Sequence, residues 1–167
     1  AVLRIGALEV EFIATTHLAF PLPVNAWLHL EENTASTQPH AHFWDYKTGE
    51  VFAMLIQCSG VRMFITGSAG FRLNRQQAPR ADAAFLSIGG LGLQKMAYVR
   101  DWFDENVREL GVRKIYLTHW DDFSRPLFPK PTRQPGVSKT LRRIERLAQT
   151  IPGLSVELLQ PGIKLKF

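Results

Sequence analysis

The chain has 167 residues, of which 46% are hydrophobic and 21% charged, a balance that indicates a globular protein with a buried core of about one domain. Its single cysteine, Cys58, excludes an intrachain disulfide and a CxxC zinc site, and we expect it to be a small core residue. No apolar run reaches the ~20 residues that span a bilayer, and no signal-peptide pattern is visible.

Short apolar runs bounded by turn residues predict β-strands along most of the chain. The first, residues 8–15, alternates in polarity. Residues 51–57 and 61–66 flank a Ser-Gly turn and predict a hairpin. The remaining predicted strands are 83–88, 114–118, 154–158 and 163–167, the last two joined by Pro161-Gly162 into a closing hairpin.

Two segments have the 3.6-residue period of helices. Residues 95–110 place their large apolar side chains on one face, and Gly111 follows as a C-terminal stop. Residues 138–150 begin with Ser138 as an N-cap candidate. Strands and helices together predict a single α+β domain over residues 1–167, with a long loop at residues 20–49 that is functional or covers something.

Positive charge is concentrated late in the chain. Residues 125–146 hold seven basic residues and one acidic residue, a net charge of +6, while the rest of the chain carries −1. Such a segment suits an anionic partner or is a solvated helix face. The absence of aromatic residues from the basic helix argues against nucleic acid as the partner.

Three predicted strands end in polar or small residues. The first ends "EFIATTH" at His17, the second ends "FITGSAG" around Ser68, and the third ends "KIYLTHWDD" at His119, Asp121 and Asp122. Functional sites are commonly built where strand ends meet at one edge of a sheet.

Three kinds of chemistry are open for the "GSAG" turn. A phosphate loop would need a following GK[ST], which is absent. A nucleophile elbow has the spacing G-x-S-x-G, so a Ser68/His119/Asp122 triad stays open without support from the spacing. A metal site fits better, because imidazole is a common ligand of zinc, iron and manganese. His40 and His42 form a weaker candidate pair in the long loop.

The order of these motifs resembles the C-terminal half of a metallo-β-lactamase-fold metallohydrolase. That family has a strand ending in a ligand histidine, matched at His17, then a hairpin ending in a T-G-D-T/S-G-like turn, which "TGSAG" resembles. A later strand ends in the last ligand histidine, matched at His119, and "LLQPGIKLKF" resembles the final hairpin. The resemblance implies an αββα-type sandwich and a metal site formed by His17, Ser68 and His119.

The sequence departs from that family in two places. Ser68 stands where the family has a metal-bridging aspartate, which favours one ion or a weak second one. The family's H-x-H-x-D-H motif is absent, since "HAHFWDY" is out of register and follows His17. We expect upstream residues to complete the site; the alternative is that a second copy or another protein does so.

The predicted function is a metal-dependent hydrolase of a small-molecule substrate, with zinc, or iron or manganese, as one or two ions. Asp121 or Asp122 would orient His119 or transfer protons. Trp44, Trp120 and Phe123 would pack in the core or wall a pocket. The alternative is a non-catalytic binding or assembly module that keeps the fold without a complete metal site. The sequence does not indicate a cellular compartment.

Overall fold

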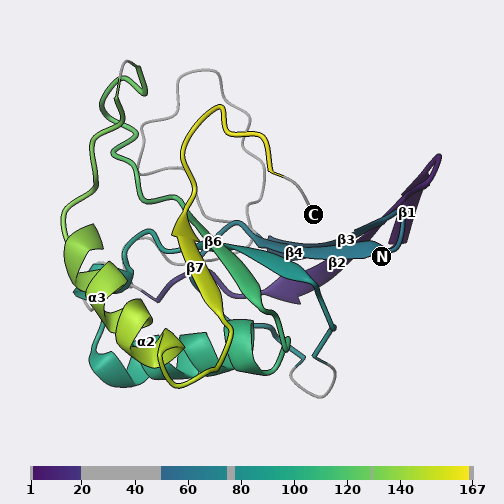
Figure 1. Cartoon of the computed structure of the whole chain (residues 1–167), viewed down its shortest axis with the longest axis horizontal. Helices are drawn as coiled ribbons and strands as arrows, with labels where there is room; N and C mark the ends of the chain where they lie inside the picture. The colour runs from purple at the N-terminus through teal and green to yellow at the C-terminus, as the bar shows by residue number, and fades with distance from the viewer. Residues whose placement is uncertain (1, 20–49, 75–77, 129, 166–167) are drawn as a thin grey trace.

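A computed structural model describes residues 2–19, 50–74, 78–128 and 130–165 of the chain. Within these residues the strands form one seven-stranded sheet whose spatial order follows the chain order. Figure 1 shows the sheet running from the first two strands, at the right, to the last two in the middle, with α2 (Met96–Phe103) below the last strands and α3 (Val137–Ala148) to their left. The predicted α+β class is confirmed.

The sheet has an antiparallel half and a parallel half. The first four strands pair antiparallel with their neighbours, and the last four pair parallel. The parallel strands β5 and β6 are the most buried, as expected for strands covered on both faces. The strands are β1 (Val2–Ile5), β2 (Leu8–Thr15), β3 (Val51–Cys58), β4 (Val61–Thr66), β5 (Ala83–Ser87), β6 (Lys114–Thr118) and β7 (Ser155–Leu158).

The helices lie in the parallel half, where each connects two strands. Helix α2 (Met96–Phe103) continues into a π-helical turn, η3 (Asp104–Arg108), and buries Trp102 and Phe103 completely. Helix α3 (Val137–Ala148) buries Ile144 against the same core, and a short 3-10 turn, η2 (Leu91–Leu93), precedes α2. The predicted apolar faces of both helices are therefore confirmed.

The structure departs from the local predictions in four places. Strand β1 was not expected, because its Val-Leu-Arg-Ile run has no alternation and all four residues are exposed. Residues 163–165 form no strand, and β7 pairs parallel with β6 instead of forming a closing hairpin. Gly136 caps α3 in place of Ser138, because a left-handed residue (φ 85°) turns the chain into the helix. Cys58 is only half-buried, because it borders the hairpin turn.

In the described part of the chain, no helix has the length and apolarity that crossing a membrane requires. The expected loop at residues 20–49, including His40, His42 and Trp44, lies outside the described residues, as do the last two residues of the expected final strand.

Candidate metal centre

The candidate residues gather at one edge of the sheet. Because β2 and β4 are both antiparallel to β3, and β5 and β6 are parallel to β4, these four strands run in the same direction. Their carboxyl ends therefore meet at a common edge, which we call the site edge. The segments that follow them carry His17, Ser68, Gly89 and His119.

Backbone contacts fasten the end of β2 to the turn after β4. Thr16 N–H donates to the carbonyl of Phe71 at 2.7 Å, and Leu18 N–H donates to the hydroxyl of Ser68 at 2.9 Å. His17 lies between these two bonds, so it is adjacent to Ser68. The small residues of the turn allow this approach: a Cβ on Gly70 would lie 1.9 Å from the carbonyl oxygen of Thr16.

The hydrogen bond of His17 fixes its tautomer. Its Nδ1 lies 3.1 Å from the carbonyl oxygen of Leu18. A carbonyl oxygen can only accept, so Nδ1 carries the proton. The neutral ring then has its lone pair on Nε2, which is the form that binds a metal ion through that atom.

His119 is held in an unusual conformation. Its φ of 55° places it in the left-handed region, which a non-glycine residue rarely adopts. The ring lies against Gly89, where a Cβ would come within 2.7 Å of Nδ1, and Nδ1 itself lies 3.1 Å from the hydroxyl of Ser87. Strained residues cluster at functional sites, where the surrounding contacts over-determine them.

Consecutive glycines link the two halves of the site edge. Gly89 contacts the ring of His119, and a Cβ on Gly90 would lie 2.3 Å from Cδ2 of Leu18, the residue after His17. The ring of His119 and the side chain of Leu18, the residue after His17, are thus packed against the same two-residue stretch. The structure therefore brings the segments that carry His17, Ser68 and His119 to one edge of the sheet.

The two aspartates lie just beyond His119 and are differently engaged. The carboxylate of Asp122 accepts from the backbone N–H and hydroxyl of Ser124 at 3.0 and 2.6 Å and pairs with Arg125 at 3.4 Å. The Ser124 bonds, with a smaller effect of Arg125, lower the pKa of Asp122 below its ordinary value. The hydrogen bond to the His119 ring comes from Ser87, and Asp121 lines a pocket beside His119.

That pocket opens next to the site edge. It has a volume of about 180 Å³. Its walls include His119, Trp120, Asp121 and Leu127. Trp120 is buried and donates from Nε1 to the carbonyl of Leu159 at 2.7 Å, so its core role is confirmed. Phe123 neither packs in the core nor lines this pocket, since 82% of it is exposed.

The donor set fits part of a metal site. Two imidazoles and one hydroxyl lie on segments that meet at the site edge, whereas a catalytic zinc ion takes three protein ligands plus water. Within the described ranges, no group of three His, Cys, Asp or Glu side chains is placed to hold an ion. Gly89 leaves the space that the His119 ring occupies, so this ring is held in place by its surroundings. The remaining ligands of a complete metal site would have to come from other residues.

Sequence reasoning missed two residues that support His119. Ser87 is 1% exposed, and its N–H donates to the hydroxyl of Thr66 at 2.9 Å while its own hydroxyl meets His119. Gly89 makes room for the ring. The available signal was "FLSIGG", a buried strand that ends in a hydroxyl and two glycines at the edge where the other strands also end.

Replacing Gly70 with alanine is expected to lower the free energy of unfolding by about 1–3 kcal/mol or more, because the added methyl meets the rigid backbone of Thr16. Gly67→Ala is the matched control, since nothing lies within 4 Å of its Cβ. Urea unfolding of both variants measures the difference. Equal stability of the two would contradict the close approach of β2 to this turn.

Comparison with known proteins identifies the fold. No protein-family model matches the sequence, and no curated protein matches it. Among solved structures, the metallo-beta-lactamase fold protein YhfI from Bacillus subtilis matches 98% of this chain and 51% of its own, with a TM-score of 0.52 and 16% identity. CmlA, a diiron beta-hydroxylase from Streptomyces venezuelae, matches 96% of this chain and 32% of its own, with a TM-score of 0.51 and 11% identity.

A third solved structure, a candidate Zn-dependent hydrolase of the metallo-beta-lactamase superfamily from Thermotoga maritima, has a TM-score of 0.46 and 12% identity over 85% of this chain and 55% of that chain. The chain thus spans about half the length of the Bacillus and Thermotoga proteins. At these identities the likeness concerns the fold alone. With its mixed sheet and flanking helices, the chain has a metallo-β-lactamase-like fold.

Proposed function

We propose that this chain contributes His17 and His119 as metal ligands to a metal-dependent hydrolase, with Ser68 beside the ion. The observation that carries the proposal is that the segments holding His17, Ser68 and His119 meet at the site edge: Leu18 bonds to Ser68 and packs against Gly90, and the His119 ring lies against Gly89. It is supported by the fold, which this chain shares with a metallo-beta-lactamase fold protein. Zinc is the proposed ion, with iron or manganese as the alternatives that imidazole ligands also suit.

The proposed ligand atom is Nε2 in both histidines. In His17 the bond from Nδ1 to the Leu18 carbonyl already leaves the lone pair on Nε2. In His119 the same tautomer arises when Nδ1–H donates to the hydroxyl of Ser87. Ser87 would then act as a positioning residue, because a partner on the far nitrogen orients a ligand ring and raises its basicity.

Ser68 is proposed to favour a single ion. Its hydroxyl is neutral and already accepts the N–H of Leu18, whereas a carboxylate could bridge two cations with two anionic oxygens. Its role would be to hold the His17 segment in place beside the ion. A weak second ion is compatible with this arrangement.

A bound ion would supply a water of lowered pKa as the nucleophile at neutral pH. The chain's own groups would bind substrate and handle protons. Asp121 or Asp122 would transfer protons; the Ser124 bonds hold the pKa of Asp122 below its ordinary value, which keeps it ionised and makes it a weaker base. Asp121 lines the pocket beside His119, where we place a small-molecule substrate.

The remaining ligands are proposed to come from polypeptide outside the described residues. A longer form of the protein would supply them in the same chain, and a second copy or a partner would supply them across an interface. In either case His17 and His119 keep their roles, because both are held by contacts within this chain.

The test combines intact mass with elemental analysis for zinc, iron and manganese on one sample of the natural protein. We expect near-stoichiometric metal in a protein heavier than the 18.9 kDa of this chain, or in an assembly that contains it. Metal-free protein of 18.9 kDa would overturn the hydrolase proposal in favour of a non-catalytic binding or assembly module.

A further inference from the structure

A projecting arm follows β6 and is closed at its base by hydrogen bonds. We define the arm as residues 121–128 and 130–134. Asp122 N–H donates to the carbonyl of Thr132 at 2.7 Å, and Gln134 donates to the carbonyls of Trp120 and Asp121 at 2.9 and 2.7 Å. Figure 1 shows the arm at the upper left, standing away from the sheet and from both α-helices.

The arm exposes large apolar side chains close together in the chain. Phe123 is 82% exposed, Phe128 73% and Leu127 44%. Elsewhere in the described residues, exposed large apolar side chains form a group on β1, lie on β2 and β3, or occur singly outside the strands. Phe123 and Phe128 are the two most exposed large apolar side chains of the described residues, and exposed apolar groups that share one loop mark interaction surfaces.

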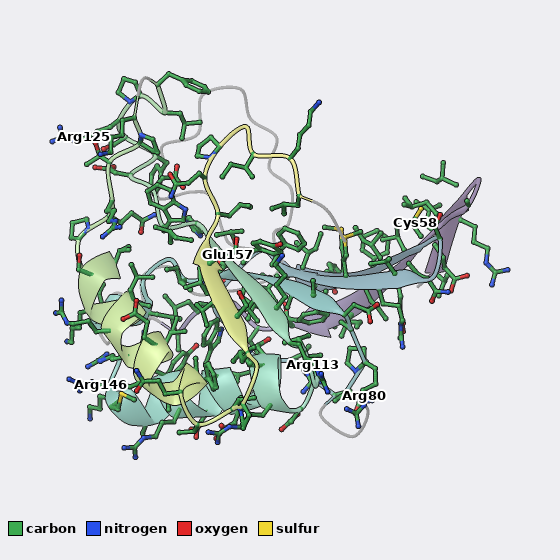
Figure 2. The ribbon with its side chains drawn as sticks, in the orientation of Figure 1. Cys58, Arg80, Arg113, Arg125, Arg146 and Glu157 are labelled. Atoms are coloured by element: carbon green, nitrogen blue, oxygen red, sulfur yellow. The ribbon has the colours of Figure 1, made fainter. Side chains whose placement is uncertain are left out.

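The same arm carries cations and lacks anions beyond its base. Arg125, Lys130 and Arg133 are exposed, and no acidic residue occurs from 123 to 133. Asp122, at the base, pairs with Arg125. Figure 2 shows Arg125 at the outer margin of the arm and Arg146 on the adjacent α3, so positive charge lies along this side of the molecule.

We propose that this arm binds the surface of an anionic lipid bilayer, with Phe123 and Phe128 entering the interface and the cations facing the headgroups. Aromatic and aliphatic side chains beside lysine and arginine are the composition that binds such interfaces. Single-stranded nucleic acid is less well matched, because its bases stack on aromatic platforms within grooves. Phe123 and Phe128 are instead 82% and 73% exposed.

The inference does not rest on the proposed metal centre. Phe123, Phe128 and the cations that carry it do not line the pocket beside His119, as Leu127 does, and none of them is a proposed ligand. A protein with His119 replaced by alanine should therefore bind vesicles as the unaltered protein does. This variant separates failure of the lipid inference from failure of the hydrolase proposal.

The experiment is flotation of the full chain with vesicles of phosphatidylcholine alone, or with about one third phosphatidylglycerol to supply negative surface charge. We expect flotation with the anionic vesicles only, and weaker flotation at high salt. Phe123→Ser with Phe128→Ser should reduce the partition coefficient by about tenfold or more, since each loses its buried apolar surface in the interface. Glutamine at Arg125, Lys130 and Arg133 should reduce it similarly.

Matched controls come from the same molecule. Leu73→Ser removes an apolar side chain that is 66% exposed in another loop and should leave flotation unchanged. Circular dichroism checks that each variant is folded. Absence of flotation of the unaltered protein, or equal loss in the Leu73 and phenylalanine variants, would overturn the inference. Phenylalanine-dependent binding of a single-stranded oligonucleotide without vesicle binding would also overturn it and assign the arm to base stacking.

Discussion

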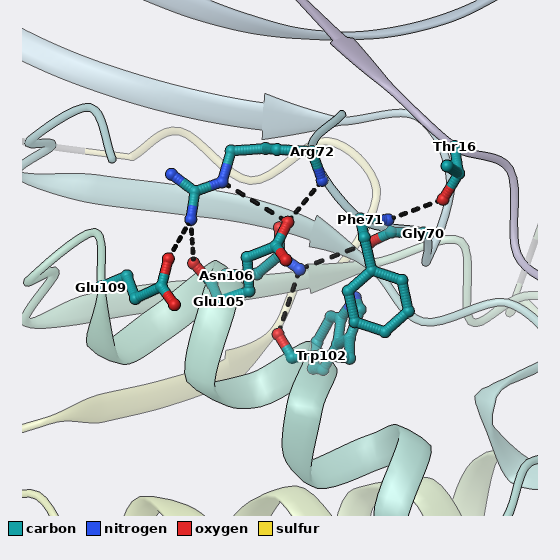
Figure 3. Close-up of polar contacts among 8 residues, drawn as sticks. All are labelled: Thr16, Gly70, Phe71, Arg72, Trp102, Glu105, Asn106 and Glu109. Carbon is teal, nitrogen blue, oxygen red and sulfur yellow. Dashed lines mark hydrogen bonds and ion pairs between the residues drawn. The ribbon is translucent and has the colours of Figure 1, made fainter. Parts of the chain in front are cut away.

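Replacing Arg72 with alanine is expected to lower the free energy of unfolding by about 3–5 kcal/mol, the usual cost of removing one partner of a buried ion pair. The Arg72 side chain is 1% exposed, and that of Glu105, 3.5 Å away, is 2% exposed. Figure 3 shows Arg72 joining the turn after β4 to η3, with Glu109 as a second carboxylate partner. Without the guanidinium, the buried carboxylate of Glu105 would lose the opposite charge that Arg72 places beside it.

Two further variants give this prediction its control. Arg4→Ala breaks an exposed pair with Glu9 and should cost only about 0–1 kcal/mol. Arg72→Met combined with Glu105→Leu removes both charges, and we expect it to be more stable than Arg72→Ala. Urea unfolding measures all three. A cost of Arg72→Ala as small as that of Arg4→Ala would contradict the buried pair.

The contacts around Arg72 also hold the turn after β4, which carries Ser68, against η3. The backbone N–H of Arg72 donates to the Glu105 carboxylate, and the side chain of Asn106 donates to the carbonyls of Trp102 and Gly70 at 3.0 and 3.4 Å. These bonds use the π-helical turn, whose wider geometry accommodates both side chains on the side facing the turn that holds Ser68. Such π-helical insertions occur frequently at functional sites.

His119→Ala is expected to weaken metal binding by more than the ~10–100-fold that loss of an outer-shell partner causes. Ser68→Ala should have a smaller effect than His119→Ala, because a neutral hydroxyl is a poor metal ligand. Competition with a chelator measures the affinity for zinc in the form of the protein that is isolated with metal.

Ser87→Ala provides the intermediate case. It leaves both proposed ligands in place but removes the hydroxyl that meets Nδ1 of His119, so we expect a loss of ~10–100-fold and partial rescue by threonine. Nitrogen NMR of the metal-free protein should show a changed His119 tautomer in Ser87→Ala. Equal metal content in His119→Ala and the unaltered protein would refute the ligand assignment.

Much of the fold was predictable because local periodicity and burial agree in this chain. The alternation of β2, the hairpin of β3 and β4 and the apolar face of α2 are each encoded within a short window. The direction in which a strand pairs with its neighbour cannot be predicted from such a short window. The sequence around β7 is compatible with a hairpin, and its parallel pairing with β6 follows from the way α3 returns across the sheet.

The sequence was sufficient to predict which strand ends carry the candidate site residues. His17, Ser68 and His119 each follow an apolar run, and strand ends of one direction share an edge. The left-handed conformation of His119 and the bond to Ser87 depend on tertiary packing between residues 32 positions apart. The sequence did not indicate that Arg72 is buried, because a basic residue after a turn is ordinarily expected to be exposed.

The hydrogen bond from Leu18 to Ser68 has a consequence for local opening of the structure, which amide hydrogen exchange measures. It joins residues 50 positions apart, and its donor is a main-chain amide that meets a side-chain hydroxyl instead of a strand partner. The amide of Ser87 is held in the same way by Thr66. Deuterium uptake at these two amides therefore reports separately on local opening after the end of β2, beside His17, and at the end of β5, beside His119, without requiring the whole domain to unfold.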